Sequence, residues 1–131
     1  MGYYNPSVAG EQNNRKTGTY YERIAAEYLV GLGYRILEQN YHAGRRGEID
    51  IIAADPENTI IFCECKYRSD AAAGDPLEAV DARKQRQICR TAMHYYARHG
   101  YDVYTPCRFD VIGIYGDGRL VHIPNAFLYT D

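Results

Sequence analysis

The chain has 131 residues, 46% of them hydrophobic, which suits one domain with a single core and leaves too little material for two. No run approaches the roughly 18 consecutive apolar residues of a membrane span, and the N-terminal residues lack the apolar segment of a signal peptide. We therefore expect a cytoplasmic protein without a membrane partner. The formal net charge of −2 argues against a protein that coats nucleic acid by charge alone. The four cysteines lack the spacing of a zinc site and are expected to be buried, reduced thiols.

The N-terminal part predicts a tail followed by a helix. Residues 1–16 are rich in Gly and Asn, show no apolar period and are expected to be mobile, which leaves 17–131 as the single domain. Apolar side chains then recur at helical spacing from about Thr17. Gly31 and Gly33 are expected to end this first helix.

A second helix and five strands are predicted in the rest of the chain. The helix has clear boundary signals, with Asp75 as N-cap, Pro76 at the first position and Gly100 at the end, about two dozen residues later. Because a helix of this length joins two strands, those strands are expected to run parallel in a mixed sheet. The fold class is therefore α/β, in the order αβββαβ, with helices packed on the sheet and a short C-terminal strand extension. The predicted strands are 34–41, 49–54, 59–67, 108–115 and 120–123.

Two charged residues interrupt the apolar strand IIFCECKY. Side chains alternate along a strand, so Glu64 and Lys66 share one face, and Cys63 and Cys65 share the other. Burying ions without partners costs several kcal/mol, so the charged face needs a partner.

The preceding hairpin supplies such a partner. If residues 55–58 form the three-residue hairpin loop that Pro and Asn favour, Asp50 lies opposite Glu64. In the same register Glu48 lies opposite Lys66, and all four side chains share one face. Glu48 is then either a further ligand or, as we expect, an ion-pair partner of Lys66.

Two carboxylates that face each other repel at neutral pH unless a cation lies between them, so Asp50 and Glu64 predict a divalent metal site. Mg²⁺ or Mn²⁺ fits, because magnesium takes an oxygen shell of one or two carboxylates, waters and a substrate phosphate. Lys66 is placed to hold the attacking water or the scissile phosphate. The pattern predicts hydrolysis of a phosphodiester bond.

Basic residues gather in three local groups, which are either one basic face or ordinary solvated charges. These groups are Arg45 with Arg46, Lys66 with Arg68, and the helical set Arg83, Lys84, Arg86 and Arg90. Lys84 occupies a helical position where an apolar residue is expected. It or Gln85 therefore either points at the site and binds phosphate or lies at the edge of the apolar stripe. The candidate nucleic-acid-binding residues are Arg45, Arg46, Arg68, Lys84 and Gln85.

Several motifs occur together between residues 18 and 114. They are Gly18 with Glu22 and Ala25, GYRILEQNY from Gly33, GEIDIIA from Gly47, Glu64 with Lys66 and Arg68, Gly74 with Pro76 and Glu78-Ala79-Val80, Lys84-Gln85, and RFDVIGI from Arg108. In this combination the chain resembles the YraN family of bacterial proteins. That family is similar to archaeal Holliday-junction resolvases within the restriction-endonuclease-like superfamily. Cys63 and Cys65 stand where the family more usually has valines, which alters the core face and leaves the charged face intact.

The resemblance implies a restriction-endonuclease-like core in which Asp50, Glu64 and Lys66 match the catalytic motif. Glu22 matches the acidic residue on the first helix and is a candidate metal ligand rather than a plain surface glutamate. The implied activity is that of a Mg²⁺- or Mn²⁺-dependent endonuclease acting on DNA.

Three functions are compatible with the sequence. The first is a DNA nuclease that acts on branched or flapped structures, and the second is a non-catalytic nucleic-acid-binding module with the same fold. The third is a protein-interaction adaptor. The carboxylate pair favours the nuclease, because a binding module needs no repelling charges. Junction-cleaving relatives act as dimers, so a homodimer is possible. Asp110, which interrupts an apolar strand beside Arg108, either supports the site residues or, as we expect, makes a structural buried polar contact.

Overall fold

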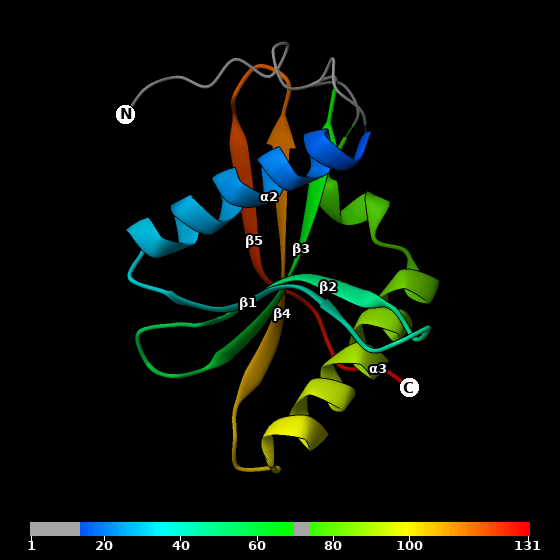
Figure 1. Cartoon of the computed structure of the whole chain (residues 1–131). Coiled ribbons are helices and arrows are strands. Elements are labelled where there is room, and N and C mark those ends of the chain that lie inside the picture. The colour runs from blue at the N-terminus through cyan, green and yellow to red at the C-terminus, as the bar shows by residue number, and fades with distance from the viewer. Residues whose placement is uncertain (1–13, 70–73) are drawn as a thin grey trace.

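The computed structural model describes residues 14–69 and 74–131 (Figure 1). Within these ranges five strands form one sheet, joined to two α-helices and one short 3-10 helix. No helix in them is long and apolar enough to span a membrane. The elements in chain order are α2 (Asn14–Gly31), β1 (Arg35–His42), β2 (Glu48–Ala54), β3 (Ile60–Arg68), η2 (Pro76–Ala79), α3 (Ala82–His99), β4 (Cys107–Tyr115) and β5 (Leu120–Phe127).

The sheet is mixed, and its spatial order follows the chain from β1 to β5. β3 and β4 run parallel, as the helical connection between them predicts, and the other neighbouring strands are antiparallel. α2 covers one face of the sheet and α3 covers the other (Figure 1). The α/β class and the order of the predicted core are confirmed.

Alternation along the strands divides the apolar side chains between two cores. In β3, Phe62 packs into the core beneath α3, whereas Ile61 and Cys63 pack into the core beneath α2. All four cysteines are free thiols; Cys63 and Cys89 are buried as predicted, whereas Cys65 and Cys107 are half-buried. The sheet is therefore buried on both faces, and any charged group within it needs a partner or a function.

The predicted second helix is in fact two helices, so that prediction was wrong. Asp75 caps only the 3-10 helix η2. Val80 then leaves helical geometry, with φ −112° and ψ 81°, and Asp81 starts α3 by accepting a hydrogen bond from the backbone N–H of Lys84. The break places the buried side chain of Val80 in the core beneath α3. Gly100 ends α3 in the left-handed conformation, as predicted.

Two other boundaries differ from the predicted ones. α2 begins at Asn14, three residues before Thr17, and β5 continues beyond the short strand predicted there, to Phe127. The ring of Phe127 stacks on Phe109 of β4 with centroids 5.1 Å apart, so burial of this aromatic pair extends β5. The rest of the predicted N-terminal tail, residues 1–13, lies outside the described residues.

β2 and β3 form a hairpin in the predicted register. Its turn contains Asn58 in the left-handed conformation, with φ 66°. Counted from this turn, the last backbone pair of the ladder is Ile51 with Cys63. The next two residues in the same register are Asp50 and Glu64.

Candidate active site

The candidate site lies where β2 and β3 separate, beyond the Ile51–Cys63 pair. There the carboxylate of Asp50 accepts a hydrogen bond from the backbone N–H of Cys65, with Oδ2 2.8 Å from N. At this position the backbone of β3 is therefore bonded to the side chain of Asp50 instead of to the backbone of β2. Asp50 is 8% exposed and Glu64 is 4% exposed. Two buried carboxylates therefore lie at the opening between the strands.

Glu48 does not pair with Lys66, so that prediction was wrong. Its carboxylate lies 3.2 Å from Nε2 of His42 at the protein surface. Regular alternation in β2 is interrupted close to Glu48, because Ile49 and Ile52 both pack into the core beneath α3. Glu48 is therefore no partner of Lys66, but its negative charge still contributes to the raised pKa values of Asp50 and Glu22, so it lies close to the site.

The carboxylates of the site carry more negative charge than their surroundings neutralise. Burial and the charge of Glu64 raise the pKa of Asp50 to about 8, against the opposing hydrogen bond from Cys65. On α2, burial and the charge of Asp50 raise the pKa of Glu22 to about 7, against a hydrogen bond with Asn40. Glu22 therefore lies near enough to Asp50 for the two charges to interact.

Two lysines approach the same carboxylate oxygen. Nζ of Lys66 lies 3.4 Å from Oε2 of Glu64, and Nζ of Lys84 lies 3.5 Å from it. Both lysine side chains are partly exposed, so their ammonium groups join the buried carboxylate to solvent. Next to Lys66 in the sheet is Gly113, on which the ring of Pro76 packs so closely that a Cβ would overlap it. η2 thus forms the wall of the site beside Lys66.

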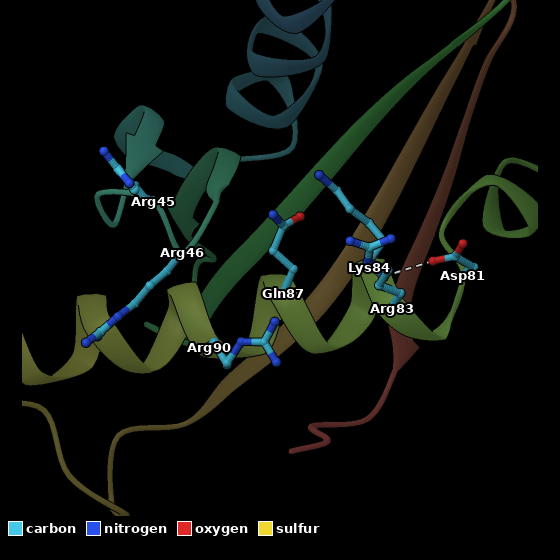
Figure 2. Close-up of a pocket in the computed structure, with 7 residues that line it drawn as sticks. All are labelled: Arg45, Arg46, Asp81, Arg83, Lys84, Gln87 and Arg90. Carbon is cyan, nitrogen blue, oxygen red and sulfur yellow. Dashed lines mark hydrogen bonds between the residues drawn. The ribbon is translucent and has the colours of Figure 1, made fainter.

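A basic groove of about 450 Å³ begins at Lys84 and lies between the β1–β2 loop and the first half of α3. In Figure 2, Arg46 extends from the loop toward the helix, where Gln87 and Arg90 lie along the facing side. The groove is lined by Arg45, Arg46, Asp81, Arg83, Lys84, Gln87 and Arg90.

Two of the candidate nucleic-acid-binding residues lie elsewhere. The side-chain amide of Gln85 donates to the backbone oxygen of Val80 at 3.0 Å, which ties it to the start of α3 instead of to the groove. Arg68, half-buried at the end of β3, is also outside the lining. Gln87 takes the place expected for Gln85. Gln87 was not predicted, although its spacing of three residues from Lys84, which places both on one helical face, could have identified it.

A divalent metal ion at this site would depend on the carboxylates of Asp50 and Glu64. Among the residues described, no group of three or more His, Cys, Asp or Glu side chains is placed to hold a metal. Glu22 therefore does not complete a three-ligand set with Asp50 and Glu64. Magnesium is commonly held by one or two carboxylates together with waters and substrate phosphate, so the remaining pair fits such an ion.

Asp110 on β4 is a further buried carboxylate, but its environment differs from that of Asp50 and Glu64. Asp110 is completely buried, and its oxygens lie 3.0 Å from Nε of Arg108 and 2.8 Å from Nε2 of His122. The backbone N–H of Asn125 donates to it at 2.9 Å. Burial alone would raise the pKa of Asp110, but these hydrogen bonds outweigh burial and lower it. The predicted structural polar contact of Asp110 is confirmed, and its side-chain partners are Arg108 and His122; no role had been predicted for His122.

The fold and the site define an α/β protein with buried, incompletely neutralised carboxylates beside a basic groove. A model of the uncharacterised protein family UPF0102 matches residues 21–114. A UPF0102 protein from Alcanivorax borkumensis is 41% identical over 120 residues, which cover 88% of this chain and 94% of that protein. One from Clostridioides difficile is 43% identical over 116 residues, which cover 88% and 99%. The chain belongs to the UPF0102 family, and the resemblance to the YraN family is thereby confirmed.

Among solved structures, the chain is similar to Pyrococcus furiosus SfsA in complex with Ca²⁺. The TM-score is 0.39 and the sequence identity 14%, over 86% of this chain and 64% of that chain. At this distance no residue role is transferred from one protein to the other.

Proposed function

We propose that this protein is a metal-dependent nuclease that hydrolyses phosphodiester bonds of DNA. The observation that carries the proposal is the pair of buried carboxylates Asp50 and Glu64, where burial and, after it, the charge of Glu64 raise the pKa of Asp50 to about 8. A fold keeps such a pair at a cost in stability, and perturbed carboxyl groups of this kind gather at functional sites. The adjoining groove of five cationic side chains suits a polyanionic substrate.

Each residue of the site has a distinct role in this proposal. Asp50 and Glu64 would hold Mg²⁺ or Mn²⁺, which when bound polarises the phosphoryl group and lowers the pKa of a bound water. Lys66, two residues after Glu64 in β3, would place its ammonium on the attacking water or on a phosphate oxygen. Glu22, with its raised pKa, is close enough to contribute negative charge or to exchange a proton near Asp50.

A second candidate function is a non-catalytic nucleic-acid-binding module. The observation that favours it is the groove itself, because five cations around one concave space bind phosphates whether or not a bond is cut. The carboxylate pair favours the nuclease, since it adds repulsion toward a phosphate and contributes nothing to a purely binding surface.

Cleavage of labelled linear, flapped and four-way DNA with Mg²⁺ or Mn²⁺ tests the proposal. The wild-type protein is expected to cut at least one of these substrates only when metal is present. Lys66→Ala should slow cleavage by about 100-fold or more, the usual effect of removing a positioned catalytic group. Arg23→Ala is the control, because Arg23 is exposed on α2, outside the site and the groove.

Two results would decide against the nuclease. If no substrate is cut with either metal, the binding module becomes the better account. If Lys66→Ala cuts as fast as Arg23→Ala, the cleavage does not depend on the assigned site.

A further inference from the structure

The basic groove concentrates positive charge in one place, although the protein as a whole has a net negative charge. Five of its seven lining residues are cationic, whereas the whole chain has a formal net charge of −2. The one carboxylate in the lining, Asp81, is engaged at the start of α3, where it accepts the N–H of Lys84 at 2.9 Å. The lining therefore selects an anionic ligand.

The two walls of the groove touch at one point. Gly47, which ends the β1–β2 loop, has φ 142°, and a Cβ there would lie 2.6 Å from the side chain of Gln87. Loop and helix thus meet in direct contact at this point, and Ala43 N–H to Gly47 O, at 3.0 Å, closes the loop. The space between them, about 450 Å³, falls in the range of roughly 300–1,000 Å³ that encloses small ligands.

The groove leads directly to the candidate active site. Lys84 belongs to its lining, and the ammonium of Lys84 is 3.5 Å from the carboxylate of Glu64. A chain of phosphates that lies in the groove therefore passes the carboxylate pair at the Lys84 end. Arg90, about two helical turns further along α3, lies in the same lining.

The arrangement of the cations in the groove fits one sugar-phosphate backbone of DNA better than two. A DNA duplex carries its two backbones on either side of grooves roughly 6 and 12 Å wide, so a protein that grips it places cations along two separate lines. Here the five cations line a single pocket, as in proteins that follow the backbone of one strand. None of the seven lining residues is aromatic, so recognition would be through phosphates and would tolerate any base sequence.

We infer that the groove binds the backbone of one unpaired DNA strand next to the scissile bond, so that the substrate class is DNA with a single-stranded arm. This inference rests on the proposed function for the position of the cut. The binding preference can be measured without cleavage.

Fluorescence anisotropy in EDTA measures that preference with three labelled probes: a single strand, a blunt duplex, and a duplex with a single-stranded arm. The single strand and the armed duplex should bind at least about 10-fold more tightly than the blunt duplex at low salt. In Arg46→Gln/Arg90→Gln this preference should be lost. The slope of log K against log salt should become shallower by about 1.4, or about 0.7 for each cation removed.

Arg23→Gln/Arg98→Gln is the matched control, since all four arginines are exposed and only Arg46 and Arg90 line the groove. This control should bind each probe within about twofold of wild type. The inference would be overturned if wild type bound the blunt duplex as tightly as the single strand and the armed duplex. Equal weakening of binding in the two double variants would also overturn it. Asp50→Asn separates the two proposals, because it should abolish cleavage while keeping the strand preference. Preserved preference in a protein that never cuts DNA would refute the nuclease alone.

Discussion

Two buried carboxylates in the same sheet, Asp50 and Asp110, have opposite environments. Asp110 receives hydrogen bonds from Arg108, His122 and a backbone N–H, and its pKa is lowered. Asp50 receives one backbone N–H and faces the charge of Glu64, and its pKa is raised to about 8. The first carboxylate holds strands together, whereas the second adds a repulsion that the fold tolerates. This contrast distinguishes a structural charge from one held in place for a ligand.

The largest expected effect is on stability at Asp110. Asp110→Ala should lower the free energy of unfolding by about 3 kcal/mol, because it leaves Nε of Arg108, Nε2 of His122 and the N–H of Asn125 without their shared acceptor, although Arg108 keeps Asp55. Denaturant unfolding by circular dichroism at pH 7.5 measures this. If Asp110→Ala costs no more than a typical surface substitution, within about 0.5 kcal/mol, the network is not a structural one.

The pH dependence of stability should differ in sign for the two carboxylates. The raised pKa of Asp50, about 8, means that the native state holds a proton that the unfolded chain has already released, so the free energy of unfolding falls as the pH rises from about 4 to 8. Glu22, with a pKa of about 7, acts in the same direction. Asp110 acts oppositely, because its lowered pKa gives stability that is lost only in acid.

Unfolding measured in EDTA at pH 5.5 and 8.0 checks these signs. Wild type is expected to lose on the order of 2 kcal/mol over this range, within the limit of about 1.4 kcal/mol per pH unit and proton. Asp50→Asn should reduce the slope, because it removes one titrating group and the charge that acts on Glu22. If the free energy of unfolding of Asp50→Asn depends on pH as in wild type, the repulsion at this site does not affect the stability of the fold.

Metal binding should produce the smallest effect. For a dissociation constant near ~1 mM, ~10 mM Mg²⁺ or Mn²⁺ stabilises the native protein by about 1.4 kcal/mol, a rise of several degrees in melting temperature. The rise should vanish in Asp50→Asn, shrink in Glu64→Gln and persist in Lys66→Ala, whose ammonium is not a ligand. A rise that persists in Asp50→Asn would place the ion elsewhere.

Much of the fold could be predicted because its signals are local. The spacing of apolar residues indicated the first helix and the strands, and Asn58 in its turn set the register that brings Asp50 opposite Glu64. The break in the second helix was missed because Asp75 and Asp81 are both good caps, and only burial of Val80 decides that both are used. Tertiary packing therefore overrode a valid local signal.

The site was predicted less completely, since its details depend on side-chain competition across the fold. Glu48 was assigned to Lys66 by register alone, but His42, nearer at the strand ends, is its partner. Lys84 was left as one of two alternatives, because helical spacing shows which face a residue occupies and not which carboxylate it reaches. The groove was foreseen only in part: Arg45, Arg46 and Lys84 were binding candidates, but the sequence did not show that they line one space, because its two walls, loop 43–47 and α3, are distant in the sequence.

The most direct test of the central claim combines cleavage and stability in one variant. Asp50→Asn differs from wild type by one oxygen replaced with an amide nitrogen, and is compared with wild type under single-turnover conditions with Mn²⁺ on the preferred DNA substrate. The account predicts that cleavage is lost while unfolding in EDTA shows stability equal to or above that of wild type. A variant that still cuts DNA at the wild-type rate, or one that loses cleavage only because it unfolds, would contradict the assignment of this carboxylate pair as a catalytic metal site.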